Sequence, residues 1–68
     1  MSDQPHIQRV VEERQQLLDR LTALGNFIDG PVYSTLNVLD QIDLQRQHEV
    51  MTELNVILSR RIRRMTST

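Results

Sequence analysis

The fold is decided by residues 37–65, NVLDQIDLQRQHEVMTELNVILSRRIRRM, whose apolar positions have the period of one long amphipathic helix. The stripe consists of Leu44, Met51, Leu58 and Met65 at heptad spacing, Leu54 between them, and Val50, Ile57 and Ile62 at its sides. A stripe of this width is stable only when another apolar surface covers it. The nearest such surface is the first half of the same chain, so the sequence predicts a helical hairpin.

The first half of the chain has a matching helical pattern. Its seam is formed by Ile7, Val10, Arg14, Leu17, Leu21, Leu24 and Ile28, at alternating spacings of three and four. This spacing predicts a helix over about residues 5–28. We expect it to end near Asp29, with Gly30 in the left-handed conformation that often follows a helix. The alternative end is Gly25; if the helix continues past it, close approach of another helix is one reason for a glycine there.

Residues 29–37 form the predicted connector between the two helices. Tyr33 belongs to a segment that can form one helical turn over the end of the hairpin. Asn37 is expected to cap the second helix, over about residues 38–65, with Asp40 in the first turn, where negative charge is favourable. The predicted structure is a single all-α domain, residues 1–68, folded as an antiparallel helical hairpin.

Antiparallel pairing of the two helices predicts which residues face each other. Leu24 should lie opposite Leu44, and Leu17 opposite Met51. Two polar residues interrupt this seam, Arg14 and Gln47; they either lean out to solvent or meet partners across an oligomer interface and fix its register. The predicted hairpin or oligomer interface contains Val10, Arg14, Leu17, Leu21, Leu24, Gln47, Met51, Leu54 and Leu58.

A chain of 68 residues buries little apolar surface. Domains of this size are usually stabilised by disulfides, metals or self-association. The sequence has no Cys, and His6 and His48 lie too far apart in sequence to suggest a metal site. We therefore expect no cofactor and no metal, and we expect a homodimer or a higher helical bundle.

Charge is distributed unevenly between the two ends of the predicted hairpin. The open end carries six of the eight Arg residues and three acidic residues, whereas the loop end carries two Arg and six acidic residues. An antiparallel dimer would bring opposite charges together. The net charge of −1 gives no general attraction to nucleic acid or to an anionic membrane. Neither a signal peptide nor a membrane span is expected from the sequence.

Candidate binding residues lie at both ends of the hairpin. Arg60, Arg61, Arg63 and Arg64 could bind phosphates or an acidic partner, or could simply complement the dipole of the second helix. Tyr33 is either an exposed contact or a cap on the core, and Phe27 is expected in the core. No Ser-His-Asp, Cys-His or phosphate-loop arrangement is present, so we predict that the protein is not an enzyme.

The chain also resembles a family of small proteins that are common in tailed-phage genomes and related to a small crAss-like phage protein. The resemblance covers about residues 10–62 and rests on Glu13-Arg14, Leu17, Arg20-Leu21, Ala23-Leu24, Phe27-Ile28, Tyr33, Leu36, Asp40, Leu44, Gln47, Met51, Leu54, Ile57-Leu58 and Arg61-Ile62. Gln47 is the least generic of these, and Leu54 stands where the family usually has an aromatic residue.

The resemblance implies a phage or prophage origin and action in the host cytoplasm. Phage proteins of this size often block host machinery, including CRISPR and signalling defences, and others sequester cyclic nucleotides as oligomeric sponges. Our first hypothesis is accordingly a non-enzymatic, homo-oligomeric module that inhibits a host defence protein, in the manner of an anti-CRISPR. The alternatives are a cyclic-nucleotide sponge and, least favoured because net charge and aromatic content argue against it, a DNA-associated regulator.

Overall fold

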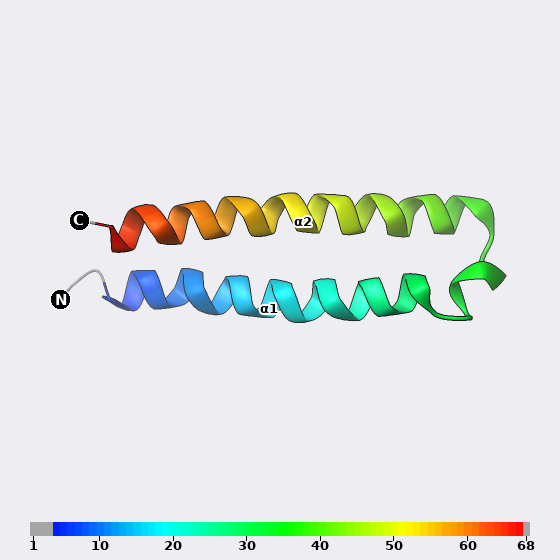
Figure 1. Ribbon diagram of the computed structural model, residues 1–68, viewed down its shortest axis with the longest axis horizontal. Coiled ribbons are helices and arrows are strands. Elements are labelled where there is room, and N and C mark those ends of the chain that lie inside the picture. Colours follow the sequence, from blue (N-terminus) through cyan, green and yellow to red (C-terminus); the bar gives the residue numbers. More distant parts are fainter. Residues whose placement is uncertain (1–3, 68) are drawn as a thin grey trace.

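The protein is an antiparallel hairpin of two long helices, as the computed structural model of residues 4–67 shows (Figure 1). Helix α1 spans Gln4–Asp29, the short 3₁₀ helix η1 spans Tyr33–Thr35, and α2 spans Val38–Thr66. Helices α1 and α2 lie side by side along their whole length, so that α1 begins at the end where α2 finishes. No strand occurs within residues 4–67. The predicted all-α hairpin is therefore confirmed, with principal extents of 51 × 15 × 13 Å.

Helix α2 begins at a reciprocal cap. The Asn37 side chain accepts a hydrogen bond from the Asp40 backbone N–H at 2.9 Å and donates one to the Asp40 carboxylate at 3.0 Å. These contacts satisfy one of the four backbone donors that a helix N-terminus leaves unpaired. The carboxylate of Asp40 also lies in the first turn, where the helix dipole favours negative charge.

Helix α1 continues through Gly25 and ends at Asp29, but not in the predicted way. No glycine within the described chain has a positive φ, so the prediction of a left-handed Gly30 is wrong. Instead, the Gly30 N–H donates to the Phe27 carbonyl at 3.1 Å and closes the helix with a tighter turn. Pro31 explains the difference, because a proline pushes the residue before it towards extended backbone.

The buried core is narrow and lies at the open half of the hairpin. Val10, Leu17 and Leu58 are buried, and Leu58 is the most completely buried at 1% exposure. Met51, Ile62 and Met65 are half-buried and pack against them. Two helices cover only a narrow stripe of each other, so residues beside the seam stay in contact with solvent.

Two residues that were expected inside are more exposed than predicted. Phe27 was predicted in the core but is 39% exposed, and Leu54 was placed on the seam but is 41% exposed. Each helix is covered by only one other helix, so only a narrow stripe of it is buried. Phe27 and Leu54 lie beside that stripe. Gln47 is also exposed, whereas Leu21 and Leu24 are half-buried.

His48 of α2 is the residue that packs against Gly25 of α1. A Cβ atom placed on Gly25 would lie 3.6 Å from the imidazole Nε2, an ordinary van der Waals distance. The helices do approach each other at Gly25, but the space would admit a methyl group.

Candidate functional site

The four arginines at the end of α2 do not form one cluster; they divide between two shallow depressions. Arg61 and Arg64 line a depression of about 300 Å³ together with His6 and Met65. Arg60 and Arg63 line another of about 370 Å³, whose remaining walls are Asn55, Val56 and Ser59. At 3.6 residues per turn, three-residue steps keep each pair on one side of the helix. The sequence predicted the group but not this division.

The charges of these arginines are not neutralised within the described part of the chain. Among residues 6–67 the single ion pair joins Arg46 to Glu49 at 3.2 Å, and both side chains are well exposed. Arg63 and Arg64 lie in the last turn of α2, where the negative end of the helix dipole stabilises positive charge. The open end of the hairpin therefore presents guanidinium groups whose donors are available to an external anion.

Two buried polar atoms on this half of the hairpin lack a hydrogen-bond partner among the described residues: Arg14 Nε and Asn55 Oδ1. Arg14 lies between the buried residues Val10 and Leu17 on α1, and Asn55 lies one turn before Leu58 on α2. The first atom is a donor and the second an acceptor, and each carries a desolvation cost while it has no partner. Asn55 also lines the depression of Arg60 and Arg63, although its Oδ1 atom is itself buried.

Tyr33 lies at the opposite end of the molecule and is held inside the connector. Its hydroxyl donates to the Gln41 carbonyl at 3.0 Å and accepts from the Gln45 side chain at 2.8 Å. Gln41 in turn donates to the Leu36 carbonyl at 2.9 Å. The half-buried ring thus ties η1 to α2. Since α2 is about 40 Å long at 1.5 Å per residue, one hairpin does not bring Tyr33 near the arginines.

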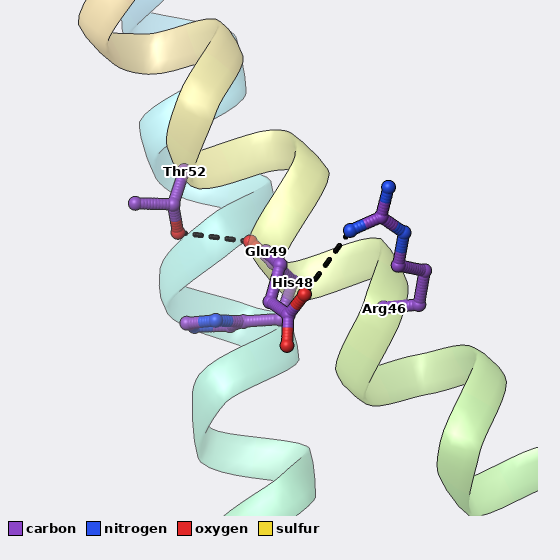
Figure 2. A network of polar contacts seen from close by, with 4 residues as sticks. All are labelled: Arg46, His48, Glu49 and Thr52. Carbon is purple, nitrogen blue, oxygen red and sulfur yellow. Dashed lines mark hydrogen bonds and ion pairs between the residues drawn. The ribbon is translucent and has the colours of Figure 1, made fainter.

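A third depression, of about 350 Å³, lies at the loop half and was not anticipated from the sequence. It is lined by Gly25, Ile28, Asp29, Gln45, His48 and Glu49. Figure 2 shows the His48 ring directed towards α1, while Thr52 donates to the His48 carbonyl at 2.8 Å and Arg46 pairs with Glu49. Gly25, a glycine within the predicted helix, was the one sequence signal for this close approach.

Metal-ligating side chains do not cluster in the part of the chain that the structure describes. Within residues 6–67, no group of three or more His, Cys, Asp or Glu residues could hold a metal ion. No helix of the described chain has both the length and the apolarity needed to cross a bilayer.

Comparison with known families identifies the class of protein. Residues 4–64 match the family model described as Sequestin, so the match covers nearly the whole hairpin. The chain belongs to the Sequestin family. The family name indicates sequestration, which is a binding role rather than a catalytic one. Searches of curated proteins and of solved structures gave no match.

Proposed function

We propose that this hairpin is a non-enzymatic sequestering protein that binds a phosphate-bearing small molecule, a cyclic nucleotide, at its arginine-rich end. The observation that carries the proposal is the set of four guanidinium groups, Arg60, Arg61, Arg63 and Arg64, that form no ion pair with the described carboxylates. Membership of the Sequestin family supports a binding role for them. The sequence favoured a host-protein inhibitor first, and the family match moves the sponge hypothesis ahead of it.

The chemistry of the site suits a cyclic nucleotide. Each phosphodiester keeps one negative charge and two free oxygens, which a guanidinium can bind through paired N–H donors. Ser59 and Asn55 supply neutral polar side chains beside Arg60 and Arg63. Such groups can contact the sugar or base and separate a nucleotide from inorganic phosphate.

One hairpin alone would hold such a ligand weakly, because its depressions are shallow and tight ligand sites are usually concave and enclosing. A second hairpin could close the site. If two hairpins lie antiparallel, the Tyr33 end of one comes beside the arginine end of the other. The ring of Tyr33 could then stack on a base.

Binding can be tested by calorimetry and by the thermal melting temperature across a panel of cyclic mono-, di- and oligonucleotides. A ligand that binds only the folded protein at 100 times its Kd should stabilise the fold by about 2.7 kcal/mol. The double variant Arg60→Glu/Arg63→Glu should abolish this shift. The matched control is Arg20→Glu/Arg46→Glu, which changes charge by the same amount at the loop end. No shift with any cyclic nucleotide would reject the proposal.

A second candidate is inhibition of a host defence protein, which the exposed apolar side chains favour. Large side chains such as Val38, Leu39 and Ile42 are more than half exposed at the start of α2. A tagged pull-down from bacterial lysate tests this function, with an Arg60/Arg61/Arg63/Arg64 charge-reversed variant beside it. A specific host protein retained by the wild type would support it. Phage origin and a place of work in the host cytoplasm belong to both proposals and rest on the sequence resemblance.

A further inference from the structure

Helix α2 carries a second heptad pattern, distinct from the seam that packs on α1. It consists of Asp40, Asp43, Gln47, Val50, Leu54, Ile57, Arg61 and Arg64, spaced alternately by three and four residues. At 100° per residue it lies roughly a quarter turn around the helix from the Leu44, Met51, Leu58 and Met65 seam. A helix with two such seams is typical of a bundle in which each helix packs on two neighbours.

The apolar positions at the centre of this second seam are only about half covered within the hairpin. Val50, Leu54 and Ile57 are 46%, 41% and 48% exposed. They are consecutive seam positions, so they form one continuous apolar patch at the middle of α2. An exposed apolar patch in the middle of a helix, bordered by charges, marks an association surface.

The charges that flank this patch have opposite signs at its two ends. Asp40 and Asp43 lie on the loop side, and Arg61 and Arg64 lie on the open side. In a parallel pair of α2 helices, each of these residues would face its own copy, and like charges would meet at both ends. In an antiparallel pair, carboxylates meet guanidinium groups at both ends.

We propose that a second copy of this chain packs on this seam, with the two α2 helices antiparallel about a two-fold axis between Val50 and Leu54. The contacts between copies are then Asp40 with Arg64, Asp43 with Arg61, Gln47 with Ile57, and Val50 with Leu54. Each contact joins the first seam position of a heptad in one copy to the second seam position of a heptad in the other. The two seams therefore stay in register along their whole length. Because the interface is two-fold, each contact occurs twice.

This pairing divides the four arginines between two tasks. Arg61 and Arg64 neutralise the partner's carboxylates, whereas Arg60 and Arg63 stay outside the seam with Asn55 and Ser59. The inference does not rest on the proposed ligand. It uses only the exposure of the apolar patch and the positions of the charges, and it is tested without any nucleotide.

The first test is the molecular mass of the purified full chain by analytical ultracentrifugation over a concentration series. We expect a dimer, and we expect Leu54→Asp to weaken it by roughly 30-fold or more while the helical content is retained. Val56→Asp, at a 49% exposed position on the side of α2 that faces away from the seam, is the control and should leave the dimer intact. A monomeric wild type, or a dimer that survives Leu54→Asp, would overturn the proposal.

The second test exchanges the charges of Asp43 and Arg61 and shows whether the two α2 helices are antiparallel. Asp43→Arg alone and Arg61→Asp alone should each weaken the dimer, and the double variant Asp43→Arg/Arg61→Asp should restore it. Arg63→Asp makes the same charge change on the side of α2 that faces away from the seam and should leave the dimer unaffected. Disulfide cross-linking also distinguishes a parallel from an antiparallel pair of α2 helices, because the chain has no Cys of its own that could interfere. A mixture of Gln47→Cys and Ile57→Cys chains should form the mixed disulfide, while rapid self-linking of Gln47→Cys would show a parallel pair and refute the model.

Discussion

Asn37 and Asp40 cap the second helix reciprocally: the Asn37 amide accepts from the Asp40 backbone at 2.9 Å and donates to the Asp40 carboxylate at 3.0 Å. The cap stands directly after the connector, so it fixes where the chain turns back into α2. Both side chains are exposed, and the cap is therefore a local feature whose contribution is separable from the core.

Replacing Asn37 with Ala should lower the free energy of unfolding by about 1 kcal/mol, because a backbone donor at the start of α2 loses its acceptor. Urea denaturation followed by circular dichroism, at one fixed protein concentration, measures the loss. Asn26→Ala is the matched control, since Asn26 is an exposed asparagine in the last turn of α1, away from the start of α2. An equal loss in both variants would mean that the cap contributes no specific stability.

Replacing Gly25 with Ala should raise the free energy of unfolding by up to about 1 kcal/mol. Glycine is unfavourable in a helix interior, and the added methyl would meet the His48 ring at an ordinary 3.6 Å. Gly30→Ala should bring no such gain, because its Cβ would come within 3.2 Å of the Asn26 carbonyl oxygen. Thermal melting of the two variants compares them directly, and a destabilised Gly25→Ala would show that the helices are closer there than described.

Replacing Leu58 with Ala should cost about 2–5 kcal/mol, the usual range for a fully buried leucine. Leu39→Ala removes the same atoms from a side chain that is 73% exposed and should change stability little. A small domain has little stability to spare, so we expect Leu58→Ala to be largely unfolded at room temperature. Introducing Asp at Leu17 or Met51 should have the same effect. Wild-type helicity in either Asp variant would contradict the proposed pairing of the helices.

Replacing Arg14 with Met should raise the free energy of unfolding by about 1–3 kcal/mol, if the buried Nε has no partner in solution. Met keeps much of the side-chain volume and removes the unsatisfied donor. Arg20→Met, at an exposed position of α1, corrects for the change in net charge. A loss of stability that depends on protein concentration would reverse the conclusion. It would show that Arg14 finds its partner across an oligomer interface, which is the other alternative that the sequence left open.

The hairpin could be predicted because its signals are local and repeated. The heptad of Leu44, Met51, Leu58 and Met65 fixes a helix and its covered face, and Asn37 marks the start of that helix. The end of α1 was harder to predict, because glycine permits several ways of ending a helix. At Gly30 the following proline decides among them, because it disfavours the left-handed conformation that a glycine after a helix often adopts.

The candidate site could be predicted only in part. Periodicity gives the direction of a side chain but not how far the partner helix extends over it, so Phe27 and Leu54 were expected to be more covered than they are. The grouping of the arginines followed from their order in the chain. Their division between two depressions depends on which neighbours, such as Ser59 or His6, stand beside each pair. Tyr33 was ambiguous because its partners Gln41 and Gln45 lie across a turn.

Because α1 begins where α2 ends, a protein fused to either terminus lies at the arginine-bearing end of the hairpin (Figure 1). A bulky reporter there would shield the charges under study, and its own carboxylates would compete for them. The connector around Ser34 lies at the far end and is exposed. In a single hairpin, an epitope inserted at that turn leaves the charged end open, whereas in the proposed antiparallel dimer it comes beside the arginine end of the second copy. A comparison of terminal and inserted labels therefore also reports on how the copies pair.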